Sequence, residues 1–416
     1  MSDLIVGTTV AVNRADITTL ARDIGPRLPG TGKERRAVHY VMRRLREIGV
    51  PAALLPVKVP PSFAFIYVVL FCWIAVGVPV AALSPLIGFV ISVLGLIILG
   101  LELFQQPIVS RLFATRRSNN VLGIVPARIN DEIGQPARRV ILSAHIDTAR
   151  SGLLWHRSLI RAFRALVITL LSASIIIPIL LLASTFHRFS SIWQVAWIPM
   201  IVLLLASILL IESEVRGTAL AGANDNASGV AALLDVAASV KYSHADNVET
   251  WFLFTTGEEA GLVGMTSFLA ENSFEPEETY FVNVTQVGAG KIRYTRAEQL
   301  IRSRDSAPVL VQLAGEIAGQ HPEREITSEV YRLLPTDQYV ALRHGYQAIT
   351  IFGANEHGAP THWHQQSDTV ESIDLATVQI AADLAYELIK RIDAKAVHRI
   401  EDTQDLRLPI TDSVAS

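Results

Sequence analysis

Histidine and carboxylate residues gather in four short segments of this 416-residue chain. They are His145 and Asp147 in "SAHIDT", Asp225 in "GANDNASG", Glu258 and Glu259 in "TTGEEAG", and His364 with Asp368 in "THWHQQSDT". Imidazole nitrogen and carboxylate oxygen are ligands of zinc, and a catalytic zinc keeps one coordination position open for water. One imidazole and two carboxylates supplied by different loops would make such a three-ligand site.

Two of these segments also suggest how a proton could be moved. Of two adjacent glutamates, one can bind metal while its neighbour takes a proton from the activated water, and Glu258 and Glu259 can divide these tasks. An aspartate two residues after a histidine can hold the imidazole by hydrogen bonding, as Asp147 could hold His145. Each segment alone is weak evidence, because similar pairs occur in solvated turns. Their joint occurrence carries the prediction of a metal-dependent enzyme.

The elements around these segments alternate between strand-like and helix-like patterns. Apolar runs predict strands at 119–127, 138–147, 250–256, 279–285 and 347–353. Apolar residues at helical spacing lie between the later strands and mark two helices in the N-terminal region. The alternation predicts an α/β sandwich with a largely parallel central sheet. In such sheets, ligands bind at the carboxyl ends of the strands, and the polar segments fall there.

Two long apolar blocks interrupt this pattern and raise the hydrophobic share of the chain to 50%. No charged residue occurs from 59 to 101, and only His187 and Arg188 interrupt the block from 165 to 211. A bilayer core needs about 20 apolar residues per helix, so each block is long enough for two spans. We expect transmembrane helices near 63–82, 86–104, 165–185 and 192–211.

Each block is therefore a hairpin, and both of its ends return to the same side of the membrane. The polar remainder, residues 1–58, 107–156 and 212–396, can then form one discontinuous domain. The hairpins occupy 59–106 and 157–211. The polar tail, 397–416, is expected to be disordered.

Flanking charges predict the orientation of the chain. Basic residues such as Lys58, Arg111 and Arg157 lie at the domain-side ends of the blocks, whereas Arg188 alone lies in the far loops. The positive-inside rule therefore places the domain on the cytoplasmic face of a multi-pass integral membrane protein. The single cysteine, Cys72, excludes an intramolecular disulfide. No signal-peptide pattern opens the chain, and a net charge of −3 gives no reason to expect a nucleic-acid partner.

The ordered set of segments resembles the M28 zinc peptidases, aminopeptidases and carboxypeptidases that bind two zinc ions in a phosphorylase/hydrolase-like, zinc-exopeptidase fold. The resemblance runs from "GPRLPGTGKERRAVHYVMRRLREIGV" through "HID", "GANDNASG", "GEEAGLVG" and "HWHQQSDT" to the last helix, and the apolar blocks lie outside it. It implies an exopeptidase of the aminopeptidase type that acts on peptides.

The resemblance also implies roles for single residues. Asp225 would bridge two metals, Glu259 and His364 would complete the first site, and His145 would belong to the second. Glu258 would be the general base, and Asp147 would orient His145. The peptide bond between Asp225 and Asn226 would be cis.

One position departs from the family's pattern. An aspartate that normally completes the second metal site follows an asparagine in a segment like "NxDxxG", but this chain has "NVTQVG", with Thr285 in place of the acid. A neutral hydroxyl is a poor zinc ligand, and the amide of Gln286 suits hard metals better than zinc. We therefore expect one tightly bound zinc ion and a second that is weak or absent.

Other interpretations of the sequence stay open. A glutaminyl cyclase with a single zinc, which closes an N-terminal glutamine without hydrolysis, is one alternative. A binding or scaffold domain without catalysis is another, although the intact first site argues against it. Asp337 is a candidate for the acid that holds the substrate's α-amine, or it is only a residue that caps the following helix. Neither the substrate-binding residues, the oligomeric state nor the role of the membrane helices in the substrate path can be deduced from the sequence.

Overall fold

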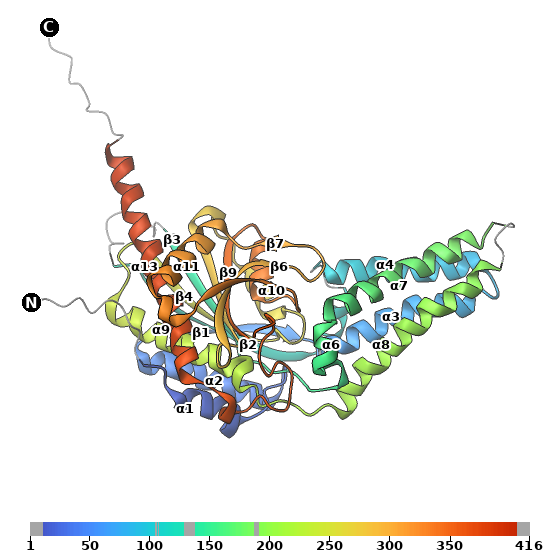
Figure 1. Ribbon diagram of the computed structural model, residues 1–416, viewed down its shortest axis with the longest axis horizontal. Coiled ribbons are helices and arrows are strands. Elements are labelled where there is room, and N and C mark those ends of the chain that lie inside the picture. Colours follow the sequence, from blue (N-terminus) through green and yellow to red (C-terminus); the bar gives the residue numbers. More distant parts are fainter. Residues whose placement is uncertain (1–10, 105, 107, 129–137, 187–190, 406–416) are drawn as a thin grey trace, which may run out of the picture.

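The structure, a computed structural model, describes residues 11–104, 106, 108–128, 138–186 and 191–405, and the side chains of these as far as residue 394. A layered α/β domain lies at one end of the molecule and a bundle of four long helices projects from it (Figure 1). The zinc-exopeptidase sandwich expected from the sequence is confirmed in its mixed sheet with a parallel centre.

The central sheet has nine strands in the described residues, in the order β1-β2-β4-β3-β5-β9-β6-β7, with β8 paired to β6. The pairs β4–β3, β3–β5, β5–β9 and β6–β8 are parallel, and the remaining pairs are antiparallel. The strands are β1 Ala52–Val59, β2 Arg116–Val125, β3 Arg138–His145, β4 Val248–Thr255, β5 Thr279–Thr285, β6 Lys291–Glu298, β7 Arg304–Asp305, β8 Thr327–Tyr331 and β9 Gln347–Ala354.

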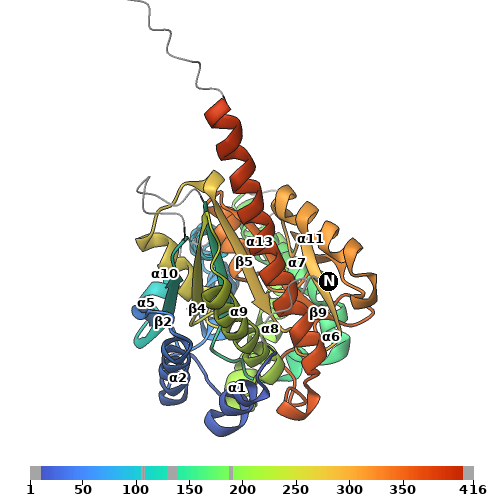
Figure 2. The ribbon, with the colours of Figure 1, turned by 90° about the vertical axis from the view of Figure 1, so that its left-hand side faces the viewer.

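Helices cover both faces of the sheet, because its central strands bury apolar side chains on each side. In β3, Val140 and Leu142 face one core, and Ile141 between them faces the other. Figure 2 shows α13 and α9 crossing the first face. That face is packed by α1 Arg14–Thr18, α2 Gly32–Ile48, α9 Gly229–Ser243, α11 Pro308–Gln320 and α13 Leu375–Asp405, and the second by α10 Val263–Glu271 and α12 Asp337–Arg343.

The projecting bundle consists of the two predicted hairpins. Its helices are α3 Phe63–Val80, α4 Pro85–Leu103, α7 Phe163–Ala183 and α8 Trp197–Arg216. All four, α8 with the short turn before it, are long and apolar enough to cross a membrane, by length and composition. α3 packs on α4 and α8, and α7 packs on the same two helices. Gly77 allows α3 and α4 to approach closely, since a Cβ there would lie 2.5 Å from the carbonyl oxygen of Gly88.

Several elements differ from the sequence prediction. β1, β6, β7 and β8 were not predicted, since β1 contains Pro56 and the others mix charged and apolar residues without a clean run. Residues 397–405, which we assigned to the disordered tail, continue α13, whereas 406–416 lie outside the described residues. His187 and Arg188 also lie outside them. The peptide bond from Asp225 to Asn226 is cis, as the resemblance implied.

Candidate metal centre

The polar segments of the sequence meet at the carboxyl edge of the parallel strands. His145 is the last residue of β3, and Glu258 and Glu259 follow the end of β4. Asp225 lies in the irregular turn before α9, and His364 lies in the loop after β9. Because parallel strands end at one edge of the sheet, side chains far apart in the sequence come together here.

Asp225 stands at the centre of the cluster. Its Oδ1 lies 3.2 Å from His145 Nε2, and its Oδ2 lies 3.5 Å from His364 Nε2. Glu259 Oε1 lies 3.1 Å from His364 Nε2. Ligand atoms of His145, Asp225 and Glu259 all lie within 4.8 Å of one another. All four predicted metal ligands are therefore in one place.

The donor set fits a bound zinc ion. Both carboxylate oxygens of Asp225 are buried and have no hydrogen-bond partner among the described residues, which is costly unless a cation satisfies them. Burial opposes protonation of His364, yet Glu259 and Asp225 raise its pKa to about 10. The cluster therefore favours positive charge, and nitrogen and carboxylate donors are those that zinc prefers.

Asp147 positions the glutamate pair as well as the histidine. Its carboxylate oxygens accept hydrogen bonds from the backbone N–H groups of Glu258 and Glu259, at 3.2 and 3.0 Å. The carboxylate is 3.7 Å from His145 Nδ1, and the backbone carbonyl of Asp147 lies closer to that nitrogen, at 3.2 Å. The expectation that the Asp147 side chain holds the imidazole is thus modified, because its main hydrogen bonds go to the glutamate loop.

The turn that carries Asp225 is held by a carboxylate and a buried cation. The carboxylate oxygens of Asp368 accept hydrogen bonds from the backbone N–H groups of Asn224 and Asp225, with N···O distances of 2.5 and 3.1 Å. Arg27 is fully buried and donates to the carbonyls of Ile146, Ala221 and Gly222. Its guanidinium therefore ties the loop after β3 to the loop before Asp225.

Arg27 was not identified from the sequence, where it stands in the turn "PRLPG". Burial lowers its pKa to about 10, against the opposing effect of Asp368, Asp147 and Asp225, so it stays charged at neutral pH. An arginine inside a proline-flanked turn was the available signal, but such a turn is usually exposed to solvent.

Thr285, in place of the expected acid, is the last residue of β5. Its hydroxyl lies 3.4 Å from His145 Nε2, where a second metal would need an anionic ligand. Gln286 adopts a positive φ of 56°, and its side-chain oxygen is buried without a hydrogen-bond partner in the described part of the chain. A second metal, as the resemblance implies it, would therefore find His145 and a share of Asp225 as strong zinc ligands among the described residues.

Two carboxylic acids behind the cluster have perturbed acidity. Burial is the main cause that raises the pKa of Glu258 well above its ordinary value, and the nearby carboxylates of Glu259 and Asp337 add to the effect. Asp337 is the first residue of α12, accepts a hydrogen bond from Thr255 at 2.6 Å, and is 1% exposed. Burial raises its pKa to about 6. Asp337 is therefore an interior residue, and the structure does not place it on an open rim where an α-amine could approach.

Tyr331, at the end of β8, is a further polar side chain beside the cluster that was not identified from the sequence. It is 2% exposed, and burial raises its pKa well above 10, with added effects from Glu298, Asp225 and Glu258. Its phenol therefore stays protonated and can donate a hydrogen bond. A lone tyrosine in a strand gives no signal in the sequence, since most such residues only pack.

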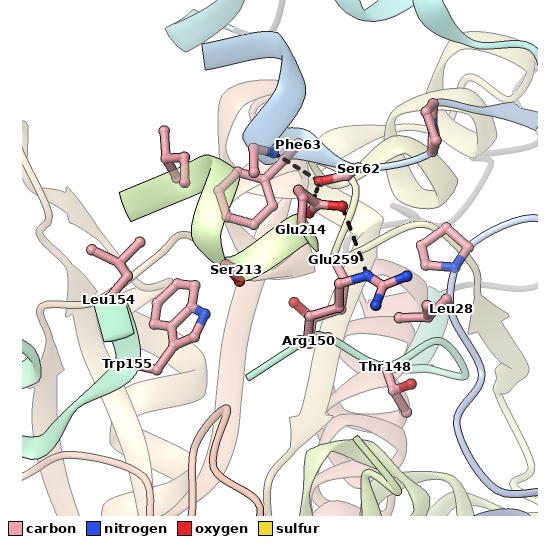
Figure 3. Close-up of a pocket in the computed structure, with 15 residues that line it drawn as sticks. Leu28, Ser62, Phe63, Thr148, Arg150, Leu154, Trp155, Ser213, Glu214 and Glu259 are labelled. Carbon is pink, nitrogen blue, oxygen red and sulfur yellow. Dashed lines mark hydrogen bonds and ion pairs between the residues drawn. The ribbon is translucent and has the colours of Figure 1, made fainter. Parts of the chain in front are cut away.

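A cavity adjoins the cluster on the side of the helical bundle (Figure 3). Glu259 and Thr148 line it from the domain, and Ser62, Phe63, Ser213 and Glu214 line it from α3 and α8. Trp155 forms another wall and packs edge-on against His364, with ring centroids 4.3 Å apart. The free volume is about 30 Å³, enough for one or two water molecules.

Part of the chain matches a known protein family. Residues 209–389 match the family model of Peptidase family M28. This segment carries Asp225, Glu258, Glu259 and His364, and His145 precedes it. A search of curated proteins gives no match.

Solved structures of aminopeptidases and of a glutaminyl cyclase share the fold. A zinc aminopeptidase from Bacillus subtilis aligns over 91% of this chain and 94% of its own, with 14% identity and a TM-score of 0.55. A leucine aminopeptidase precursor from Bacteroides thetaiotaomicron aligns over 92% and 99%, with 15% identity and a TM-score of 0.53. A glutaminyl cyclase from an Acidobacteriales bacterium aligns over 95% and 99%, with 12% identity and a TM-score of 0.53. At such identities the likeness shows the fold alone.

Proposed function

We propose that this protein is a membrane-anchored, zinc-dependent exopeptidase of the aminopeptidase type. The observation that carries the proposal is the meeting of Asp225, Glu259 and His364 beside the largely buried Glu258. A zinc ion held by these three ligands would supply Lewis acidity, which polarises a peptide carbonyl and lowers the pKa of water. The likeness to zinc peptidases supports the same reaction class.

The residues of the chain have separate tasks in this reaction. Glu258 accepts a proton from the attacking water and delivers it to the leaving amine, for which its raised pKa is suited. Asp147 fixes the backbone from which Glu258 and Glu259 project. Tyr331, whose phenol is affected by the charges of Asp225 and Glu258 and stays protonated, is our candidate for a donor to the carbonyl oxygen as that oxygen gains negative charge.

The metal requirement follows from the donor set. The first position has three strong ligands, and the second has two because Thr285 replaces an acid. We expect one tightly held zinc ion per chain. We further propose that the four apolar helices span the bilayer and that the domain faces the cytoplasm, for which the basic flanks give support. A reporter enzyme that is active only outside the cytoplasm, fused after Ser416, tests this orientation. Activity of that reporter would contradict a cytoplasmic domain.

The test compares wild type with Glu258→Ala on aminoacyl fluorogenic amides, and zinc per chain is measured on the same preparations. Glu258→Ala should lower kcat by about 10²- to 10⁴-fold and keep its zinc, because Glu258 is not a proposed ligand. Glu271→Ala, on an exposed acid at the end of α10, is the matched control. A metal-free wild type, or undiminished hydrolysis by Glu258→Ala, would refute the proposal.

Glutaminyl cyclase activity is a second candidate function, which the incomplete second metal position at Thr285 favours. In that reaction the α-amine of an N-terminal glutamine attacks its own side-chain amide and releases ammonia. Mass spectrometry of a peptide with N-terminal glutamine separates the two reactions. Release of free glutamine supports the peptidase, and loss of ammonia from an otherwise intact peptide supports the cyclase.

A further inference from the structure

The cavity beside the candidate metal ligands has walls from two protein layers. One wall belongs to the α/β domain, through Glu259 and Thr148. The other belongs to the bundle, through Phe63 at the start of α3 and Leu210 and Glu214 near the end of α8. The domain-side ends of two candidate membrane spans therefore help to enclose the reacting centre.

The junction between α8 and the loop after β3 is tightly packed. A Cβ on Gly152 would lie 2.7 Å from the Cβ of Ser213, and one on Gly217 would lie 2.1 Å from the carbonyl oxygen of Ser151. Ser213 donates a hydrogen bond to that same carbonyl at 2.9 Å. Because α8 and this loop are in close contact, a shift of the helix toward the loop would cause steric clashes. The position of α8 therefore sets the shape of the cavity.

A buried apolar cluster joins the bundle to the candidate metal ligands. Trp155 and Trp363 both contact the ring of His364 and belong to one buried cluster with residues of all four long helices. Trp155 also stacks on Phe163 at the start of α7. These buried rings therefore join the apolar core of the bundle to the candidate metal ligands by continuous contacts.

Large apolar side chains are exposed where the bundle meets the domain. Leu153 is 58% exposed and Val215 is 76% exposed, and each is adjacent in sequence to a residue that lines the cavity. Leu112, in the short helix α5 Val109–Phe113 that packs on α3 and α4, is 77% exposed. Exposed apolar residues at the ends of membrane spans mark the level of the bilayer interface. With the four helices in a bilayer, as proposed above, the cavity would lie near that level.

We propose, on the basis of the exopeptidase function above, that the substrate is a peptide anchored in the bilayer, whose free N-terminus reaches Glu259 between α3 and α8. The site would act on the short N-terminal segment that such a polypeptide displays at the membrane surface. The cavity has room for only one or two waters, so the side chains that line it must move when the first residue of a substrate enters. The lining side chains of α3 and α8 therefore limit the size of that substrate residue.

The experiment uses the full chain in vesicles of phosphatidylcholine and phosphatidylglycerol, with three probes. They are an aminoacyl fluorogenic amide, a soluble peptide, and the same peptide joined by about five residues, about 17 Å when extended, to a membrane-spanning helix. We expect kcat/KM for the anchored peptide to exceed that for the soluble one by at least about tenfold. Confinement to one membrane also raises this ratio, so the ratio alone is insufficient.

A matched pair of variants on α8 separates the access route from confinement. Leu210 lines the cavity, whereas Ile208 is 60% exposed on the lipid side. Leu210→Trp should lower kcat/KM for the anchored peptide at least about tenfold with unchanged zinc content, and Ile208→Trp should leave it unchanged. Equal effects of the two variants, or equal rates on the anchored and the soluble peptide, would overturn the proposal.

Crosslinking gives a readout that does not depend on catalysis. A non-hydrolysable anchored peptide with a photoreactive second residue should label residues 61–64 and 210–214. The opening lined by Pro26, Lys33, Arg36 and Ala219 is the competing route, and labelling confined to it would overturn the proposal. Failure of wild type to hydrolyse even the aminoacyl amide would refute the exopeptidase function instead, while the crosslinks still report the route.

Discussion

Replacement of Arg27 by lysine tests whether a residue outside the ligand set holds the candidate metal centre together. The guanidinium makes five hydrogen bonds to backbone carbonyls, those of Leu20, Gly25, Ile146, Ala221 and Gly222. A lysine ammonium has three donors on a single atom, so at least two of these carbonyls would lose their donor. Each buried carbonyl without a partner costs about 1–3 kcal/mol, so Arg27→Lys should cost roughly 2–6 kcal/mol.

This cost falls on the loops that carry the metal ligands. Ile146 follows His145, and Gly222 lies three residues before Asp225. Arg27→Lys should therefore hold the side chains of His145 and Asp225 less firmly in place, while the positive charge at residue 27 is kept. We expect zinc affinity to fall about 10- to 100-fold, as for other residues that orient metal ligands. The assay is competition with a zinc chelator, together with the thermal unfolding midpoint of the same samples.

Arg44→Lys is the control for this measurement, since the hydrogen bonds of the Arg44 side chain among the described residues go to Asp16, at 2.8 Å, and to Glu47. It should leave zinc affinity unchanged. Wild-type zinc affinity in Arg27→Lys, with an unchanged unfolding midpoint, would refute the positioning role. Loss of stability with unchanged zinc affinity would show that Arg27 supports the fold but does not set the ligand geometry.

Three further predictions concern single residues. Thr285→Asp should raise bound zinc from about one to about two ions per chain, measured by elemental analysis, because it supplies a third ligand to the second position; two tightly held ions in wild type would contradict this. Tyr331→Phe should lower kcat about 10- to 100-fold with little change in KM, since its hydrogen bond strengthens only in the transition state; a change confined to KM would argue against this role. Burial, together with Asp16, raises the pKa of Asp235 to about 8, so the stability that this acid contributes is fully present below about pH 4 and is lost as pH rises toward 8. Asp235→Asn should therefore raise the free energy of unfolding by up to about 4 kcal/mol at pH 7, since one pKa unit is about 1.4 kcal/mol, and hardly at all at pH 4; equal shifts of the unfolding midpoint at pH 4 and pH 7 would contradict the assignment.

Much of the fold could be predicted from local patterns. The buried strands β3, β4, β5 and β9 have near-continuous apolar runs, and the two hairpins have uncharged stretches longer than any ordinary core helix. These signals survive in the sequence because burial on both faces, or in lipid, leaves no room for polar residues. The edge strands β1, β7 and β8 lack that constraint, and they were missed.

The candidate ligands could be predicted to lie together because zinc accepts few side-chain types and because His145 ends a strand, Glu259 follows a strand, Asp225 precedes a helix and His364 lies in the loop after a strand. The departure at Thr285 was visible for the same reason. The supporting residues were not visible. Arg27 and Tyr331 gain their importance only from burial beside acids that are far away in the sequence.

The sequence by itself therefore determined which residue types can hold a metal, where the sheet has its buried strands, and which segments are apolar enough to enter a bilayer. The tertiary structure alone decided that Asp147 serves the glutamate loop, that Asp337 lies in the interior, and that α3 and α8 form walls of the cavity beside Glu259. The physical reason is that composition and periodicity reflect whether each segment faces water, the protein interior or lipid. Contacts between distant segments depend instead on how the whole chain packs.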